Sequence, residues 1–456
     1  MPIWVVDHVR SGIVRIRARA LQNSELQNVW RLGVRSGLSM IDQGLTSGSS
    51  FLLNVLLARW LLKEAYGAFA MAFIGFLFVA GFHNVLVLEP ISVMGSSRHL
   101  NCLSAYFLMQ LKAHAMVTGA LSVMCLPVAG LLAFQHLAGF AGEAILGAAI
   151  SLPFLLLLGL TRRMCYVAQC PALAAKAGLL NVLMILCGAG GLHHWGWLNP
   201  LSAFLLLGMA GFLASATILS GLELLGTGEK RMAAPRLPSV LSENWSYGRW
   251  LTLTTVLSWL SVQAQAFFVG SDLGLGEAGV MRAMQLPSLA MTQVISAATL
   301  LMLPSLSREL GDRNFLRLHK KTVFASMILS ALGCLFVVFL GLYSGQTERL
   351  LFGGKYASSA WLMPALGLAS VFTGFATSYS YALRTLGKAR FELLAYLLSA
   401  ITAVVTAAVL MPRWGLPGAV ASVVFSSGVL MASVFCCYLK WGRFAPLRQP
   451  SVSAAD

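Results

Sequence analysis

The sequence contains few charged side chains, and acidic side chains are especially scarce. Asp and Glu together number 16 in 456 residues, against 32 Lys and Arg, and charged residues make up only 11% of the chain. Soluble domains carry about 25% charged residues. The composition therefore excludes a long soluble domain.

Several chemical motifs are also absent from the sequence. The eight cysteines form no Cys-x-x-Cys and no cluster with histidine at metal-ligand spacing, so we expect buried apolar thiols and no metal site. No Gly-x-x-x-x-Gly-Lys-Ser/Thr occurs, and Gly274-x-Gly276-x-x-Gly279 follows an apolar helix pattern rather than the strand that a dinucleotide site requires. We therefore expect no cofactor, and an energy source other than ATP: an ion gradient, the membrane potential or consumption of the product.

Long apolar runs are what the sequence does contain. Hydrophobic residues make up 58% of the chain, and the mean hydropathy is +0.77. A membrane-spanning helix needs roughly 20 apolar residues. The predicted spans are 38–61, 66–89, 110–134, 142–161, 171–192, 198–222, 249–270, 280–303, 322–343, 358–383, 392–412 and 416–439. The predicted fold class is therefore all-α, a polytopic membrane protein with about twelve transmembrane helices.

Basic residues are distributed unevenly between alternate loops. With the N-terminus placed in the cytosol, most of the 32 Lys and Arg fall in the tails and loops on the cytosolic side, and few fall in the outer turns. This is the positive-inside pattern, and it predicts that both termini are cytosolic. The net charge of +16 is thus interpreted as a topology signal and a contact with anionic membrane lipids, not as a nucleic-acid interface.

The two halves of the chain resemble each other weakly. The matched positions are Glu64 with Glu277, Arg162 with Arg384 and Trp195 with Trp414. Six predicted helices separate the copies, so both halves have the same orientation, as in transporters built from parallel repeats. The predicted organisation is a basic cytosolic tail (1–36), an N-lobe of helices 1–6 (37–222), a cytosolic linker (223–245), a C-lobe of helices 7–12 (246–440) and a cytosolic C-terminal tail (441–456).

A polar stripe runs along one face of the first predicted helix and recurs on the seventh. The stripe residues are Ser39, Asp42, Gln43, Thr46, Ser50 and Asn54 on the first helix, and Thr254, Ser258, Ser261 and Gln265 on the seventh. A helix in lipid cannot direct such a stripe at hydrocarbon without a large penalty. The stripes therefore either line a water-filled cleft between the lobes or hydrogen-bond neighbouring helices. We favour the cleft, because Asp42 is charged and the stripe is long.

Short motifs in order along 33–440 resemble a known family. They are Asp42-Gln43-Gly44, Ala58-Arg59, Tyr66-Gly67, Leu88-Glu89-Pro90, Arg162-Arg163-Met164-Cys165-Tyr166, Tyr247-Gly248-Arg249-Trp250, Leu351-Phe352-Gly353-Gly354-Lys355-Tyr356 and Trp414-Gly415-Leu416-Pro417-Gly418-Ala419. Together they resemble polysaccharide repeat-unit flippases of the O-antigen and exopolysaccharide type, in the multidrug/oligosaccharidyl-lipid/polysaccharide exporter superfamily.

This resemblance implies a transporter rather than an enzyme. It would move undecaprenyl-pyrophosphate-linked oligosaccharide from the cytosolic to the periplasmic leaflet of the bacterial inner membrane by alternating access, for surface or exopolysaccharide biosynthesis. Polysaccharide polymerase or export proteins are the expected partners.

Four cations within or beside the predicted helices are candidates for binding the pyrophosphate: Arg282, Lys112, Lys176 and Arg249. A cation at the centre of a membrane helix costs about 2.5–3.5 kcal/mol on insertion scales, so it is a functional candidate. The alternative for Lys112, Lys176 and Arg249 is that their side chains extend to the membrane surface. The alternative for Arg282 is a structural ion pair with Glu277 or Asp272.

Asp42 and Glu89 are candidates for ion coupling. In the simpler interpretation, these carboxylates form structural ion pairs with Lys112 or Lys176 instead. His83 and His114 are expected to be core histidines with local hydrogen bonds.

Two other function classes stay open. A multidrug antiporter of the same superfamily would need carboxylates in its cleft. An integral-membrane glycosyltransferase or polymerase would need a loop with catalytic acids, but the longest predicted outer loop, 344–356, has Glu348 as its only acid.

Overall fold

The structure is a computed structural model that describes residues 37–134, 139–222, 235–388 and 390–442. The predicted tail 1–36, residues 223–234 of the predicted linker and residues 443–456 lie outside this part of the chain. All regular elements of the described residues are helices.

The helices follow one another through short turns. The first helix covers residues 37–60. The others are α2 (Lys63–His83), η1 (Asn84–Leu88), α3 (Glu89–Met94), η2 (Leu100–Cys102), α4 (Leu103–Phe134), α5 (Gly139–Val167), α6 (Pro171–His194), α7 (Pro200–Gly221), α8 (Leu237–Phe268), η3 (Val269–Leu273), α9 (Leu275–Gly311), α10 (Phe315–Phe352), η4 (Ala357–Ser359), α11 (Leu362–Thr385), α12 (Arg390–Trp414), α13 (Leu416–Cys437) and η5 (Tyr438–Gly442).

The predicted all-α membrane fold is confirmed. Each predicted span overlaps one observed helix, with α2, η1 and α3 forming one span, and nine helices among the described residues are long and apolar enough to cross a membrane. Several helices are longer than their apolar runs; α10, for example, carries Lys320 and Lys321 near one end and Arg349 near the other. Helix α8 begins at Leu237, inside the segment that the sequence assigned to the linker.

Local sequence signals explain several helix boundaries. Proline at the first turn, where its missing N–H costs nothing, begins α6 and α7. Asn199 and Ser202 form a reciprocal capping box at the start of α7. At the other end of a helix, Gly353 has a φ of 71° and ends α10 in the left-handed conformation that glycine adopts without strain.

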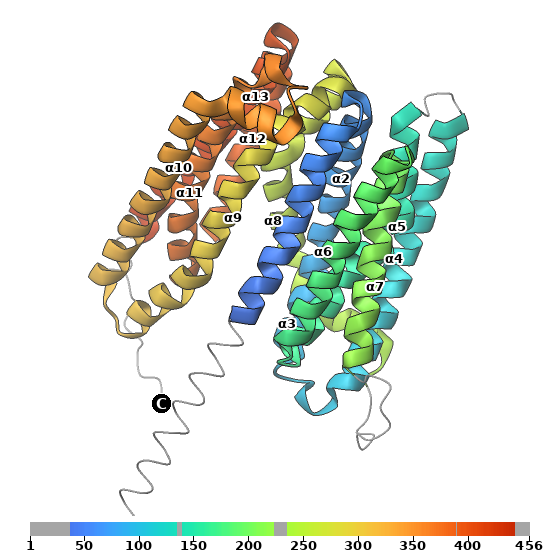
Figure 1. The fold of residues 1–456 in the computed structure, drawn as a ribbon. Helices are drawn as coiled ribbons and strands as arrows, with labels where there is room; N and C mark the ends of the chain where they lie inside the picture. The colour runs from blue at the N-terminus through green and yellow to red at the C-terminus, as the bar shows by residue number, and fades with distance from the viewer. Residues whose placement is uncertain (1–36, 135–138, 223–234, 389, 443–456) are drawn as a thin grey trace, which may run out of the picture.

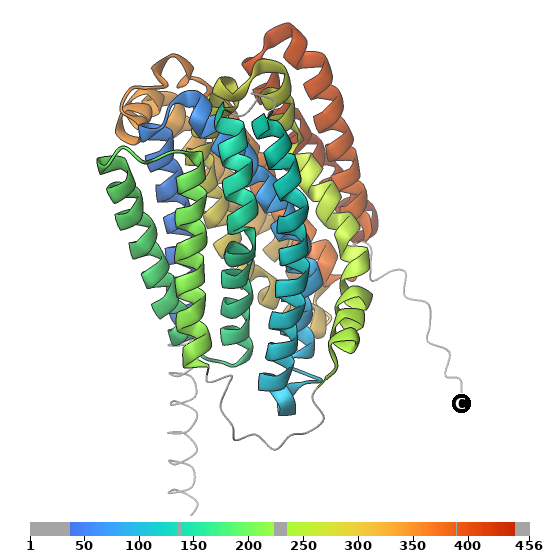
Figure 2. The ribbon, with the colours of Figure 1, turned by 90° about the vertical axis from the view of Figure 1, so that its right-hand side faces the viewer.

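The helices form two groups, which we call the N-lobe (the first helix and α2–α7) and the C-lobe (α8–α13). In the N-lobe α5 packs on α4 and α7, and in the C-lobe α12 packs on α8 and α13. Figure 1 shows the N-lobe in blue to green on the right and the C-lobe in yellow to red on the left. Figure 2, turned by 90°, shows the N-lobe helices running side by side along a common axis.

The lobes meet most closely where α2 and α9 begin, an end of the molecule that we call the closed end (upper part of Figure 1). Gly67 of α2 faces the main chain of Leu275, and Gly279 of α9 faces the carbonyl of Lys63. A Cβ at either glycine would overlap the backbone of the other helix. Two glycines thus permit a backbone contact that no other residue allows. We call this contact the α2–α9 seam.

A lysine of the C-lobe adds a second contact at the closed end. The Lys355 ammonium donates to the carbonyls of Ala58 (2.9 Å) and Leu61, and the Tyr356 hydroxyl donates to Ala58 (3.1 Å). These carbonyls end the first helix and have no partner within it. Burial, and then the charge of Lys63, hold the pKa of Lys355 below its usual value, while Glu64 acts in the opposite direction.

The first part of α8 connects the lobes at the opposite end, which we call the terminal end because the first helix begins there. The side-chain amides of Asn244 and Gln110 (α4) bond reciprocally at 3.0 and 3.1 Å, and both are buried. Glu243 bonds to His99 at 3.1 Å. Helix α8 therefore begins against the N-lobe and continues into the C-lobe.

We predict that Gly67→Ala separates the lobes at the closed end, because the added methyl group overlaps the carbonyl of Leu275. Spin labels at the exposed positions Leu62 and Leu350, in a cysteine-free background, should report a longer distance in this variant by pulsed electron paramagnetic resonance. Gly75→Ala on the same helix is the matched control, since a Cβ there meets nothing within 4 Å. The same distances in both variants would contradict the close packing of the seam.

Candidate functional site

Asp42 of the first helix is fully buried and ionically paired. Its Oδ2 accepts hydrogen bonds from Arg162 Nη2 (2.7 Å), from Arg162 Nε (3.1 Å) and from the Tyr166 hydroxyl, both residues of α5. Its Oδ1 has no partner among the described residues and faces Gly178, where a Cβ would lie 2.8 Å away. The expected pairing with Lys112 or Lys176 is therefore not the one observed.

The rest of the first-helix stripe is divided between buried and exposed positions. Asn54 is buried, donates to the carbonyl of Ser50 (2.8 Å) and lies 3.5 Å from the Tyr66 hydroxyl. Ser50 and Gln43 are exposed, whereas Ser39 and Thr46 are half-buried. One face of the first helix thus presents exposed polar side chains, and Gln43 and Ser50 on this face stay candidates for lining the predicted cleft.

On α8 the stripe points in two directions. Ser261 lies 2.5 Å from Ser399 of α12, and Gln265 donates to Ser426 of α13 (3.1 Å); both are buried inside the C-lobe. Thr254 and Ser258 are half-buried. Ser261 and Gln265 therefore connect helices of the C-lobe, as in the alternative interpretation of the stripe.

Arg282 lies buried at the α2–α9 seam, with only 7% of its surface exposed. Its Nε has no hydrogen-bond partner, and the ion pairs of the described residues include none between Arg282 and Glu277 or Asp272. The phenol of Tyr66 on α2 is a titratable neighbour of the guanidinium. A buried guanidinium without a carboxylate is costly, so this position is destabilising unless an anion reaches it.

The other candidate groups lie nearer the surface or are bonded locally. Lys112, Lys176 and Arg249 are exposed. Glu89 accepts from the Asn84 amide at 3.1 Å. His83 Nε2 lies 3.1 Å from His114 Nδ1, and His114 Nε2 lies 3.1 Å from the carbonyl of Pro153, so the two histidines form the local pair expected of core residues.

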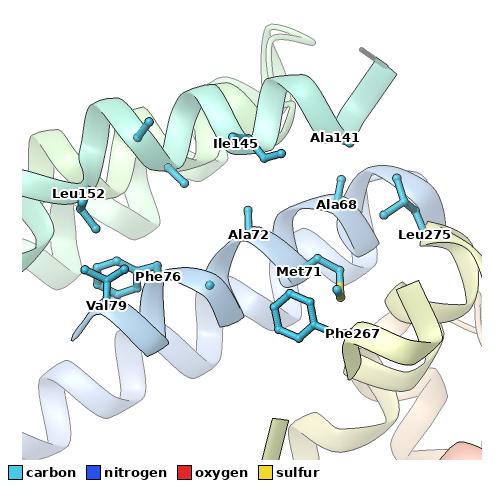
Figure 3. Close-up of a pocket in the computed structure, with 13 residues that line it drawn as sticks. Ala68, Met71, Ala72, Phe76, Val79, Ala141, Ile145, Leu152, Phe267 and Leu275 are labelled. Carbon is cyan, nitrogen blue, oxygen red and sulfur yellow. The ribbon is translucent and has the colours of Figure 1, made fainter. Parts of the chain in front are cut away.

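Near the seam there is also an apolar cavity of about 450 Å³ (Figure 3). Ala68, Met71 and Phe76 of α2 line one side, Ile145 of α5 another, and Phe267 of α8 completes it. No lining residue carries a charged or polar side chain. This cavity suits hydrocarbon and excludes a polar head group.

The fold is that of MATE transporters of the MOP superfamily. A structure described as the inward-facing conformation of a multidrug resistance MATE family transporter matches with a TM-score of 0.76 at 14% identity, over 91% of this chain and 100% of that chain. An outward-facing conformation of such a transporter matches with a TM-score of 0.65 at 16% identity, over 91% and 95%. A MOP superfamily transporter from Pyrococcus furiosus Vc1, described as having a binding pocket of reverse polarity, matches with a TM-score of 0.66 at 16% identity, over 91% and 96%.

The sequence itself gives a narrower match. Residues 210–361 match the profile of a family described as "Polysaccharide biosynthesis protein". A search of curated proteins found no match. The predicted resemblance is thus supported in two respects: about a third of the chain matches a polysaccharide biosynthesis family, and the fold matches that of MATE transporters.

We predict that stripe positions of the first helix and of α8 that are not fully buried face water. In a cysteine-free background, cysteines at Thr46, Ser50 and Ser258 should react with aqueous maleimides, whereas Ser261→Cys should not, because Ser261 is bonded to Ser399. Leu52→Cys is the matched control, since Leu52 is 43% exposed but lies off the polar stripe. Equal labelling at Ser50 and Leu52 would reject a water-filled cleft.

Proposed function

We propose that this protein moves undecaprenyl-pyrophosphate-linked oligosaccharide from the cytosolic to the periplasmic leaflet of the bacterial inner membrane, with both termini in the cytosol. The observation that carries the proposal is the buried, unpaired Arg282 at the α2–α9 seam. The match of residues 210–361 to a polysaccharide biosynthesis family supports it.

The proposed substrate cannot cross a membrane without assistance. Each sugar hydroxyl that loses water in hydrocarbon costs roughly 1–3 kcal/mol or more, and the charged pyrophosphate costs far more. The protein must therefore provide polar groups and cations for the head, while the polyprenyl tail stays in an apolar environment. The exposed Gln43 and Ser50 are candidates for the first task, and the apolar cavity beside α2 is a surface suited to the tail.

Alternating access assigns a role to the seam. The closed end corresponds to the periplasmic side, in keeping with the higher TM-score for the inward-facing transporter. When the seam opens, Arg282 becomes accessible and offers its forked donors to phosphate oxygens. A pyrophosphate that binds only in the opened state shifts the lobes toward that state. Lys112 and Lys176, nearer the cytosolic side, hold the anion earlier in the cycle.

The multidrug alternative fits the charges less well. A cationic drug would need a free carboxylate, but Asp42 is neutralised by Arg162 and Glu89 is engaged by Asn84. Glu348 is buried without a cationic partner among the described residues, but its carboxylate accepts the backbone N–H of Tyr356 (2.8 Å). Arg282 is a buried cation whose Nε has no partner at all, and it suits an anion.

We predict that Arg282→Ala lowers polysaccharide export at least about tenfold while membrane insertion stays normal. A hydrogen bond to a charged group contributes about 1.5–3 kcal/mol, and about 1.4 kcal/mol corresponds to a factor of ten. Arg282→Lys should keep part of the activity, and Arg282→Glu should be worse than alanine. Export is measured in a deletion strain that carries each variant, together with the lipid-linked repeat units trapped on the cytosolic leaflet. Arg413→Ala, an exposed arginine at the closed end, should behave as wild type.

Three outcomes would contradict this role of Arg282. Unchanged export in Arg282→Ala would remove it directly. Rescue of Arg282→Glu by Glu277→Arg or Asp272→Arg would show a structural ion pair. Rescue of Arg282→Ala by Gly67→Ala would show that the arginine only loosens the seam.

A further inference from the structure

A polar cavity of about 230 Å³ lies within the C-lobe, apart from the seam. Its walls are formed mainly by α9 and α11. Six hydroxyl side chains face it: Thr292, Ser296 and Thr299 of α9, and Thr373, Thr377 and Ser380 of α11. Thr292 and Ser296 are exposed, so the cavity is open rather than sealed. The function proposed above has so far used none of these residues.

The one charged pair in the lining of this cavity is neutral overall. Arg384 Nε donates to Glu392 Oε2 (2.6 Å), and Arg384 Nη2 donates to Glu392 Oε1 (2.7 Å). Both carboxylate oxygens are thus engaged, which leaves no free carboxylate for a cation. The guanidinium charge is also balanced, which disfavours an inorganic anion. The cavity therefore favours a neutral polar ligand.

The threonine hydroxyls present mostly acceptors to the cavity. Thr292, Thr373 and Thr377 each donate their only proton to a carbonyl of their own helix, at 3.1, 2.8 and 2.7 Å. Each hydroxyl oxygen then has lone pairs left to accept a hydrogen bond from a ligand. Of the five N–H groups of Arg384, Glu392 takes two, so the opposite end of the cavity retains donors. Sugar hydroxyls both donate and accept, and they match this arrangement.

Two tyrosines and the position of the cavity support the same ligand class. Tyr381 and Tyr396 add rings and hydroxyls to its lining, which suit the apolar face and the polar edge of a pyranose. Gln293, next to Thr292, lies 3.1 Å from Ser47 of the first helix, so the α9 wall is at a contact between the lobes. The volume of the cavity is below the ~300–1,000 Å³ of sites for drug-sized ligands, so the cavity favours a ligand with a single ring.

We propose that this C-lobe cavity binds one neutral sugar residue of the transported head group. The inference rests on the proposed function and adds the part of the substrate that the C-lobe recognises. The matching arginine of the other half, Arg162, is 14% exposed and serves Asp42 and Tyr166, whereas Arg384 is 45% exposed and lines a cavity. At these matched positions, the arginine of the N-lobe thus forms a structural ion pair, whereas the arginine of the C-lobe lines a ligand site.

The test is binding of defined lipids to the full-length protein in nanodiscs. The probes are undecaprenyl pyrophosphate without sugar, and the same lipid bearing glucose, galactose or N-acetylglucosamine. Wild type should bind at least one sugar-bearing lipid about tenfold more tightly than the sugarless lipid. Thr292→Val with Thr377→Val, which removes two acceptors at nearly constant shape, should abolish that difference and leave the sugarless affinity unchanged. Thr402→Val, which replaces a threonine bonded in the same way on α12 outside the cavity, is the matched control.

The possible results separate the two proposals. Wild type that binds all the lipids equally, or a double variant that keeps the preference, would overturn the sugar site and leave the flippase standing. If the double variant bound the sugarless lipid as weakly as the sugar-bearing lipids, the threonines would have a structural role in the lobe. That result would also overturn the sugar site. Wild type that binds none of the lipids would reject both the proposed function and this inference. The thermal unfolding midpoint of each variant guards against loss of binding through misfolding.

Discussion

The backbone contact between α2 and α9 is the constraint on which the rest of the structure depends. Gly67 and Gly279 let the two helices touch, and this contact holds the lobes together at one end and buries Arg282. The same seam therefore contains a stabilising close contact and a destabilising charge. A cation within a membrane helix costs about 2.5–3.5 kcal/mol. A contact with opposing terms of this size can open when an anion compensates the charge, as alternating access requires.

Polarity is divided between the lobes in a way that fits a ligand with three chemically different parts. Arg282 at the seam suits an anion, the cavity lined by Ala68 and Phe76 suits hydrocarbon, and the threonine cavity beside Arg384 suits a sugar. The charge of Asp42, by contrast, is used inside the N-lobe to fix Arg162. In the proposed cycle the head group therefore meets its recognition groups mainly on the C-lobe.

Hydropathy predicted the helices because a spanning segment must be apolar over its whole length, but it could not predict which neighbour each polar side chain meets. Ser261 has the same spacing as Thr254 and Ser258, yet it bonds to Ser399 because α8 packs on α12. The Asp42–Arg162 pair joins residues on the first helix and α5, a contact set by tertiary packing. The match of Arg162 to Arg384 in the sequence indicated only the repeat; the C-lobe cavity with its hydroxyl lining became evident when α9 and α11 were placed together.

Translocation by the purified protein tests the central claim most directly. The full-length chain is reconstituted in liposomes that contain undecaprenyl pyrophosphate linked to a fluorescent sugar, and the fraction of label quenched by an impermeant reductant is followed over time. The account predicts that quenching rises from the outer-leaflet half toward the whole pool in wild-type vesicles and stays near half with Arg282→Ala. Quenching that stays near half with wild type, as in protein-free vesicles, would contradict it.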